Sequence, residues 1–94
     1  MRENEFRAWL EHVKKLSPRA INDYVSRGKR VMRCLQINLD EEFKKDKGRD
    51  ALKLLVDNGA AVSRLEFSKG ANVREGLASL RSAVMAYFDF CQHL

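Results

Sequence analysis

Long apolar runs, histidine, proline and cysteine are scarce in this chain of 94 residues, and each scarcity excludes a class of protein. No segment approaches the roughly 18 uninterrupted apolar residues of a membrane-spanning helix, so we expect no membrane partner. The first residues, MRENEFRAWLEH, carry charge where a secretion signal needs an apolar core, which predicts a cytoplasmic protein. Cys34 and Cys91 lie far apart without metal-ligand spacing, so we expect buried, reduced thiols and neither a disulfide nor a metal site.

Recognisable catalytic motifs are also missing from the sequence. It contains no glycine-rich phosphate loop, no histidine-rich metal motif and no nucleophile elbow. His12 and His93 lie near opposite ends of the chain. The acidic run from Asp40 to Glu42 is explained by the attraction between acidic side chains and the start of a helix. Nothing assembles an acid, a base and a nucleophile, so we expect neither enzymatic activity nor a cofactor.

Positive charge is abundant and concentrated in one part of the sequence. The formal net charge is +5, which favours acidic partners such as nucleic acid. Residues 14–33 contain seven lysines and arginines and a single acid, Asp23, an excess of six positive charges. The charges of the remaining residues nearly cancel, so the basic character of the chain is local.

The spacing of apolar residues predicts an all-α protein, a compact bundle of four to five helices. Apolar side chains recur at three- and four-residue intervals, and no segment shows strand-like alternation bounded by hairpin turns. A short ordered turn is expected around Val62 to Phe67, in the connection before the last helix. The predicted helical regions are about 3–15, 18–36, 40–59 with a break at Gly48 and an Asn58-Gly59 terminator, and 72–92.

Four residues have the properties expected at helix starts. Ser17 and Pro18 form a strong start signal, because a serine side chain satisfies exposed backbone N–H groups and proline suits the first helical position. Asp40 and Asn72 are the corresponding candidates for the third region and the last helix.

The apolar sides of the predicted helices define the expected core. Gly28 lies on the apolar side of 18–36, where its missing side chain would let another helix approach closely. The last helix carries further apolar residues, Met85, Ala86 and Phe90, which leaves open a protein–protein interaction or oligomerisation module as the alternative function. The core-facing side chains are predicted to be Phe6, Trp9, Leu10, Val13, Ile21, Val25, Met32, Leu35, Phe43, Ala51, Leu54, Leu55, Leu77, Leu80, Val84, Phe88 and Cys91.

The polar residues of region 18–36 share the opposite side of that helix. We call them the basic arc: Arg19, Asn22, Ser26, Lys29, Arg30 and Arg33. At about 100° per residue they span about 100° of the helix circumference without an acid, although Asp23 borders them. A merely solvated helix usually interleaves opposite charges at four-residue spacing. Arginine and lysine neutralise phosphates, and a helix fits the major groove, so a nucleic-acid surface and a solvated face both remain open.

A second candidate contact precedes and begins the last helix. Lys69 and Asn72 flank Gly70-Ala71, and Arg74 follows in the first turn. This order would place a cation, a flexible backbone and a helix N-terminus together, as a phosphate contact requires.

Three segments together resemble a known family. FRAWL, LSPRAINDYVSRGKRVM and NVREGLASLRSAVMAYFDFC resemble the SAM-like N-terminal core-binding domain of tyrosine recombinases, the phage-integrase family. That domain commonly has an aromatic-rich first helix, an LS-x-x-T-I-x-x-Y helix start and a last helix of the type L-x-x-L-R-x-F-F-x-F. The resemblance covers most of the chain and rests on apolar spacing and caps. Ala20 stands where the family often has threonine.

The resemblance implies a DNA-binding role. In this family the helical bundle forms half of a C-shaped clamp on duplex DNA, opposite a separate C-terminal catalytic domain. By position, Ser17, Arg19, the outward residues of the basic arc and Asn72 would approach the DNA. The arginine, histidine and tyrosine constellation that cleaves DNA is absent from this sequence. The chain would therefore be the isolated core-binding domain of a longer integrase-like protein, or a stand-alone relative, with neighbouring protomers as further partners.

Overall fold

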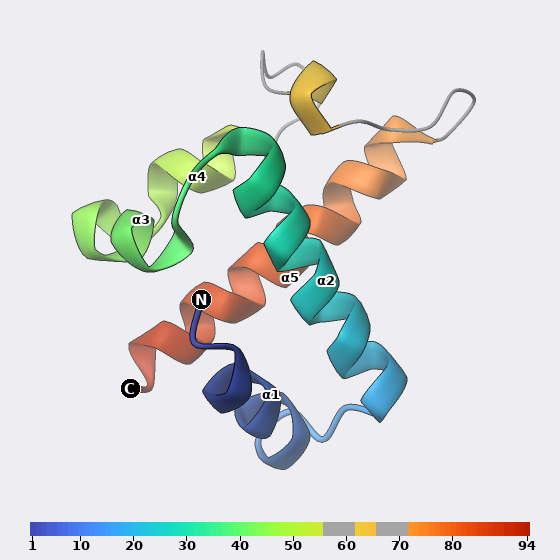
Figure 1. Cartoon of the computed structure of the whole chain (residues 1–94), viewed down its shortest axis with the longest axis vertical. Helices are drawn as coiled ribbons and strands as arrows, with labels where there is room; N and C mark the ends of the chain where they lie inside the picture. The colour runs from blue at the N-terminus through green and yellow to red at the C-terminus, as the bar shows by residue number, and fades with distance from the viewer. Residues whose placement is uncertain (56–61, 66–71) are drawn as a thin grey trace.

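The computed structural model describes residues 1–55, 62–65 and 72–94, and these ranges are helical apart from short turns (Figure 1). No strand occurs within them, which confirms the all-α prediction for the described residues. The predicted terminator Asn58-Gly59 lies outside these ranges. The helices are α1 (Glu3–His12), α2 (Pro18–Leu35), α3 (Leu39–Asp46), α4 (Arg49–Lys53), the 3-10 helix η1 (Val62–Leu65) and α5 (Val73–Gln92).

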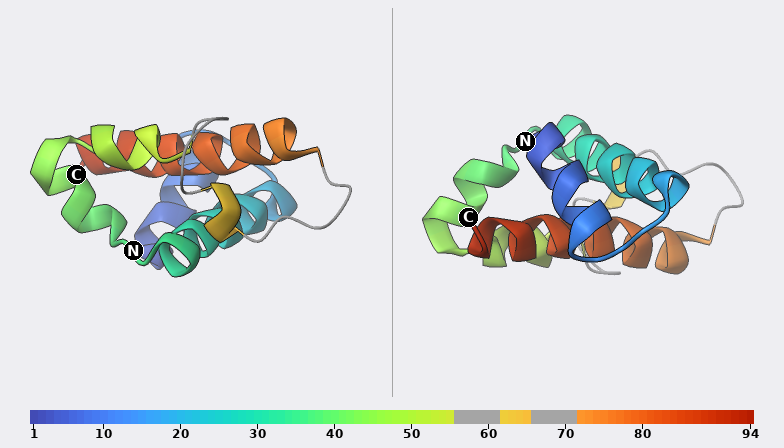
Figure 2. Two further views of the ribbon diagram at one scale, coloured as in Figure 1. Left: turned by 90° about the horizontal axis from the view of Figure 1, so that it is seen from above. Right: turned by 90° about the horizontal axis from the view of Figure 1, so that it is seen from below.

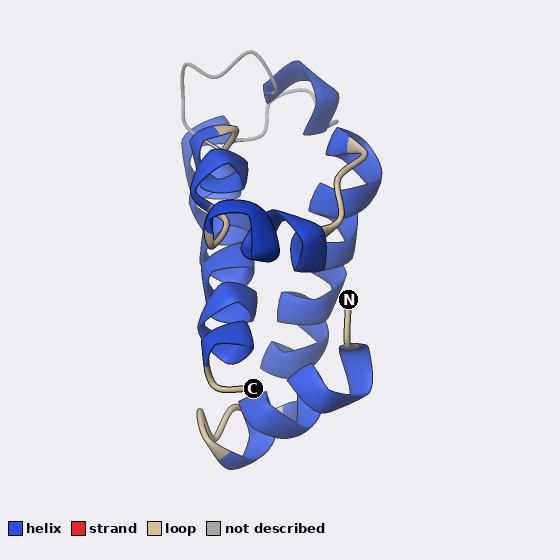
Figure 3. Cartoon of the chain, turned by 90° about the vertical axis from the view of Figure 1, so that its left-hand side faces the viewer, coloured by secondary structure: helices blue, strands red, loops and turns tan. Residues whose placement is uncertain are grey.

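The two longest helices, α2 and α5, cross at the centre of the molecule and lie in different layers (Figures 1 and 2). They share the most extensive tertiary contact of the fold. α4 lies beside α5, whereas α1 and α3 bridge between the layers (Figure 3). The principal extents of 36, 30 and 17 Å describe a flat body about two helices thick. One side of α2 therefore packs on α5, and its opposite side forms an outer face of the molecule.

The core lies between these layers and draws side chains from every described helix. Its centre is aromatic: Phe6 of α1 meets Tyr87 of α5 edge to face, with ring centroids 5.0 Å apart. Trp9, Met32, Phe43 and Cys91 are only partly buried. The remaining predicted core residues are buried except for Val13 and Leu54, which are 58% and 36% exposed. The buried set is Phe6, Leu10, Ile21, Val25, Val31, Leu35, Leu39, Ala51, Leu55, Leu65, Leu77, Leu80, Ala83, Val84, Tyr87, Phe88 and Phe90.

α1 is shorter than its predicted range and ends at His12. The chain reverses just beyond it, where Lys15 adopts a positive φ of 56° and the Leu16 N–H donates to the Leu10 carbonyl oxygen at 3.1 Å. Val13 therefore leaves the buried side of the helix. The prediction that it faces the core was wrong for this reason.

α2 begins where its sequence signals predict. The Ser17 Oγ accepts a hydrogen bond from the Ala20 N–H at 3.2 Å, and Pro18 occupies the first helical position. A cap of this kind contributes about 1 kcal/mol to helix stability. The helix ends at Leu35 because Gln36 adopts the left-handed conformation, with φ of 54°.

Gly28 is buried in α2. The prediction that another helix approaches it closely was wrong, because its neighbour is a side chain that precedes α1. A Cβ atom at this position would lie 2.6 Å from Cε of Met1, the residue ahead of α1. The missing side chain thus makes room for the end of the N-terminal methionine side chain.

The third predicted region divides at Gly48, as expected, into α3 and α4. Gly48 has φ of 84°, and a Cβ atom there would overlap the Phe88 ring of α5. The cap of α3 is Asn38 and not the predicted Asp40, because the Asn38 Oδ1 accepts from the Asp40 and Glu41 N–H groups at 2.9 and 3.2 Å. Leu54 is exposed because it follows the end of the short α4.

α5 starts at the predicted cap. The Asn72 Oδ1 accepts a hydrogen bond from the Glu75 N–H at 3.2 Å. The helix is apolar on most sides because the other described helices surround much of it: α1, α2, α3 and α4 all contact it.

Candidate nucleic-acid interface

The basic arc lies on the outer side of α2, because the apolar side of the helix is held against the core. Ile21, Val25 and Leu35 are buried, with at most 7% of their surface exposed. At about 100° per residue, the midpoint of the basic arc lies about 130° from the midpoint of these three residues, so most of the arc faces outward. Two neighbouring elements, α1 and η1, contact α2 and reach the two edges of the arc.

At one edge, α1 supplies an acid that the basic arc itself lacks. The Glu3 carboxylate pairs with Lys29 Nζ and also with Arg7 Nε, the latter at 3.0 Å. Arg7 Nη1 donates a hydrogen bond to Asn22 Oδ1 at 2.6 Å. Two of the six residues of the basic arc, Asn22 and Lys29, are therefore engaged by α1, which the sequence pattern of α2 alone did not indicate.

The charge of Glu3 is stabilised by this arrangement. The hydrogen bond from Lys29 and the hydrogen bond from Arg7 lower the pKa of the Glu3 carboxyl below its ordinary value. Glu3 is therefore ionised at neutral pH, and its negative charge cancels part of the positive charge at this edge of the arc.

At the other edge, Arg30 binds backbone. Its Nη2 and Nε donate to the Leu65 carbonyl oxygen of η1 at 2.5 and 3.2 Å. Arg64 of η1 donates in return to the Leu35 carbonyl oxygen of α2 at 3.0 Å. The two crossed arginines hold η1 against α2, so the Arg30 guanidinium serves the fold as well as the surface charge.

Between these edges, Arg19, Ser26 and Arg33 remain exposed; we call them the open strip. Neither arginine forms an ion pair with a described residue. Successive members are seven residues apart, which is about 10.5 Å along the helix axis. The two arginines are thus separated by about 21 Å with a hydroxyl side chain halfway between them.

The predicted contact at the start of the last helix lies elsewhere. Asn72 and Arg74 are exposed at the beginning of α5, which belongs to the layer opposite α2 (Figure 2). Because the open strip points away from α5, these two groups do not join it on one face. Lys69 lies outside the described residues.

The sequence did not indicate a polar cluster around Tyr87. The Tyr87 hydroxyl donates to Asp40 Oδ1 at 2.5 Å and accepts from the Arg2 N–H at 2.8 Å, and the Met1 ammonium pairs with Asp40 Oδ2 at 3.1 Å. Tyr87 stands seven residues after Leu80 and three after Val84, so the stripe of α5 could have shown its burial. The cluster joins the starts of α1 and α3 to α5.

Burial and hydrogen bonding together determine the protonation states of Tyr87 and Asp40 in this cluster. Burial, followed by the hydrogen bond to Asp40, raises the pKa of Tyr87 far above its ordinary value. Burial also acts to raise the pKa of Asp40, but the Tyr87 hydroxyl and the Met1 ammonium outweigh it and the pKa is lowered. A neutral tyrosine therefore donates to an ionised aspartate. This hydrogen bond joins α5 to α3.

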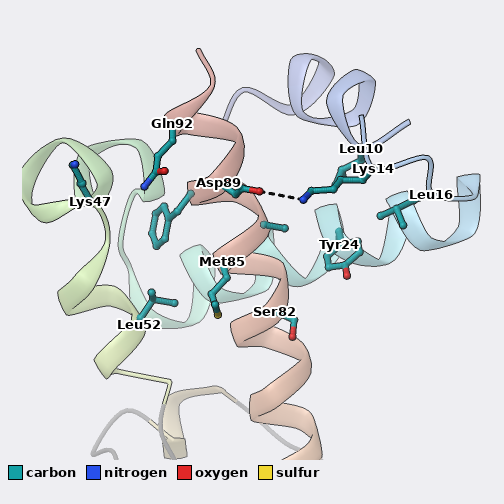
Figure 4. Close-up of a pocket in the computed structure, with 12 residues that line it drawn as sticks. Leu10, Lys14, Leu16, Tyr24, Lys47, Leu52, Ser82, Met85, Asp89 and Gln92 are labelled. Atoms are coloured by element: carbon teal, nitrogen blue, oxygen red, sulfur yellow. Dashed lines mark ion pairs between the residues drawn. The ribbon is translucent and has the colours of Figure 1, made fainter. Parts of the chain in front are cut away.

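A groove of about 650 Å³ lies over one face of α5 and is also lined by Leu10 of α1, Tyr24 of α2 and Leu52 of α4 (Figure 4). Met85 lies in it and is 53% exposed, whereas Ala86 is half-buried. Lys14 forms an ion pair with Asp89 at 3.2 Å at one side of the groove. Phe90 does not contribute, because it is 3% exposed and packs on Phe6 with ring centroids 5.5 Å apart. The predicted apolar interaction surface thus keeps Met85 and loses Phe90.

The described residues contain no group of three or more histidine, cysteine, aspartate or glutamate side chains that could hold a metal ion. No disulfide joins Cys34 and Cys91 in the described part of the chain, and both are only partly buried, not buried as predicted. Burial raises the pKa of the Cys91 thiol. None of the helices in the described ranges combines the length and hydrophobicity that crossing a bilayer requires.

No family model, no curated protein and no solved structure matches this chain. The chemistry and geometry of its surfaces are therefore the basis for a functional proposal.

Proposed function

We propose that this chain binds duplex DNA through the outer face of α2. The observation that carries the proposal is the open strip, in which Arg19 and Arg33 are exposed and form no ion pair with a described residue. An unpaired arginine is available for bidentate binding of a phosphate. Phosphate neutralisation releases counterions from DNA, which supplies most of the binding free energy of such a contact.

The dimensions of the strip suit a duplex. The major groove of B-DNA is about 12 Å wide and admits an α-helix. The two arginines are separated by about 21 Å, which exceeds the groove width, so a helix lying across the groove would place their side chains over the phosphates on its two sides. Ser26, midway between them, would lie over the groove, where its hydroxyl can donate or accept a hydrogen bond, directly or through water.

The resemblance to integrase core-binding domains supports the same proposal. The three segments that carry the resemblance form α1, α2 and α5. Ser17 and Asn72 cap α2 and α5, and each side chain accepts a hydrogen bond from a backbone N–H group. We propose that the chain acts as the DNA-binding module of an integrase-like recombinase. In this role it binds DNA, and a separate catalytic domain of the parent protein cleaves it.

The second candidate function is protein–protein interaction through the groove on α5. The observation in its favour is Met85, which is 53% exposed among apolar neighbours such as Leu52 and Tyr24. Exposed methionine is common at adaptable binding surfaces. The two functions use different surfaces of the molecule and are compatible with each other.

Paired substitutions test DNA binding. Replacing Arg19 and Arg33 by glutamine removes two phosphate contacts. The decrease of log affinity with log salt concentration should therefore become less steep, by about 1.8 in the slope. At about 0.15 M salt this corresponds to an affinity loss of about thirtyfold. Fluorescence anisotropy with a labelled duplex of about 20 base pairs, at about 50 to 200 mM NaCl, measures both quantities.

The matched control replaces Arg49 and Lys53, two exposed cations of α4, by glutamine. It makes the same change in net charge in the opposite layer, and we expect a much smaller loss of affinity. Wild-type protein without salt-sensitive binding contradicts the proposal. An equal loss in the control would show that the charge of the whole chain, and not the open strip, attracts the DNA.

A further inference from the structure

We propose that Glu3 competes with DNA phosphate for Lys29 and Arg7, and so limits the affinity of the α2 face for DNA. This inference rests on the proposed function and adds a built-in competitor to it. The competitor comes from α1, whereas the open strip belongs to α2.

The position of Glu3 carries the first step. Lys29 precedes Arg33 of the open strip by four residues. At about 100° per residue, this spacing places Lys29 about 40° from Arg33 on the α2 circumference. The Lys29 side chain is 53% exposed, and those of Glu3 and Arg7 are 33% and 35% exposed. These groups are therefore at the surface, where a duplex lying against the open strip reaches them.

The chemistry of the contact carries the second step. The Glu3 carboxylate accepts from a lysine ammonium on one oxygen and from an arginine guanidinium on the other. Carboxylates and phosphates are bound by the same arrangement of cationic N–H donors. The carboxylate thus occupies the position in which a phosphate oxygen would meet the same two donors.

The hydrogen bond between Arg7 and Asn22 carries the third step. Arg7 Nη1 donates to Asn22 Oδ1 at 2.6 Å while Nε of the same guanidinium holds Glu3. The guanidinium is therefore fixed beside α2 by a bond that does not depend on Glu3. Loss of the carboxylate would leave Arg7 held by Asn22 and would release Lys29, so that both cations could bind phosphate.

Replacing Glu3 by glutamine tests this inference. Each additional phosphate contact is worth about fivefold in affinity at about 0.15 M salt and adds about 0.9 to the salt slope. We expect Glu3→Gln to bind a labelled duplex of about 20 base pairs at least about fivefold more tightly than wild type, with a steeper salt dependence. Circular dichroism of the variant checks that the helices are retained.

Glu11→Gln is the matched control. Glu11 is an exposed acid of the same helix, and no ion pair joins it to a described residue. It undergoes the same change in charge, so its effect measures the contribution of net charge alone. An affinity gain of Glu3→Gln that does not exceed that of Glu11→Gln overturns the inference, and so does a loss of affinity.

A double-mutant cycle with Lys29 supplies an independent readout. If Glu3 masks Lys29, Lys29→Gln has less than about a twofold effect in the wild-type background and about a fivefold effect in the Glu3→Gln background. Equal effects in the two backgrounds overturn the competition. If wild type and all variants fail to bind DNA, the proposed function is overturned and this inference with it. If the protein binds DNA but the effects of the Glu3 and Lys29 substitutions are independent, only this inference is overturned.

Discussion

At the scale of single residues, Asp40 joins the most distant parts of the chain. Its carboxylate accepts from the Tyr87 hydroxyl and pairs with the Met1 ammonium. Because these partners belong to α5 and to the segment before α1, Asp40 couples both ends of the chain to the start of α3. A carboxylate held this way stabilises the folded state only while it is ionised.

The pH dependence of this contribution follows from the lowered pKa of Asp40. The stabilisation is fully present above the ordinary carboxyl pKa of 3.8 and is lost as the pH falls through the lower folded-state value. We expect Asp40→Asn to lower the free energy of unfolding by about 1–3 kcal/mol at neutral pH, with a difference that shrinks below about pH 4.

Urea denaturation at several pH values measures this difference. Glu41→Gln is the control, because Glu41 is the exposed neighbour of Asp40 in the first turn of α3. A loss of stability in Asp40→Asn that stays constant down to about pH 3 would show that the Asp40 charge contributes nothing.

The residue scale also shows what sequence can and cannot predict. The Ser17 and Asn72 caps were predicted correctly because a cap depends on groups within three residues. Asn38 and Asp40 are both cap-forming residues two positions apart, and periodicity does not choose between them. The pairing of Glu3 with Lys29 depends on how α1 lies against α2, which the pattern of either helix alone does not contain.

At the scale of elements, Gly48 is the junction that turns one predicted helical region into α3 and α4. Its φ of 84° is costly for other residues, and the Phe88 ring occupies the space of a Cβ atom. We expect Gly48→Ala to destabilise the protein by about 2–4 kcal/mol through backbone strain and overpacking. Thermal or urea denaturation followed by circular dichroism measures the change.

Gly28→Ala serves as the comparison for this prediction. There the added methyl group meets only the flexible end of the Met1 side chain, and helix propensity favours alanine by about 1 kcal/mol. The net effect should therefore lie within about 1 kcal/mol of zero. Equal destabilisation by the two substitutions would contradict the structural role assigned to Gly48.

The elements also explain two errors of the sequence interpretation. Phe90 belongs to the apolar excess of α5, but α1 covers it through Phe6 and Trp9. Val13 continues the apolar spacing of α1, but the helix ends one residue before it. In both cases the side chain has the expected chemistry, and the placement of a neighbouring segment decides its exposure.

At the scale of the whole molecule, the two layers separate the two candidate functions. α2, which carries the open strip, and α5, which carries Met85 of the groove, lie in different layers (Figures 2 and 4). On titration with duplex DNA, we expect the backbone amide NMR signals of Arg19, Ser26 and Arg33 to shift most. Those of Met85 and Gln92, which line the groove, should shift little.

The same titration can reject this assignment. Predominant shifts along the groove of α5 would place the DNA on the other layer, and the open strip would then be a solvated surface. The basic arc and the start of α5 are both predicted DNA contacts. Their relative position was not predictable, because the pattern of each helix does not show how the two helices pack. α2 and α5 bury their apolar sides against each other, and this places the two sets of cations on different faces.

The position of Trp9 has a practical consequence for all these measurements. It is the single tryptophan of the chain, and its ring lies 5.9 Å from that of Phe90 and 5.1 Å from Lys14 Nζ. The indole thus senses the docking of α1 on α5 and does not belong to the helix that carries the open strip. Its intrinsic fluorescence supplies a label-free optical signal for the integrity of the bundle while DNA binding is followed by another probe.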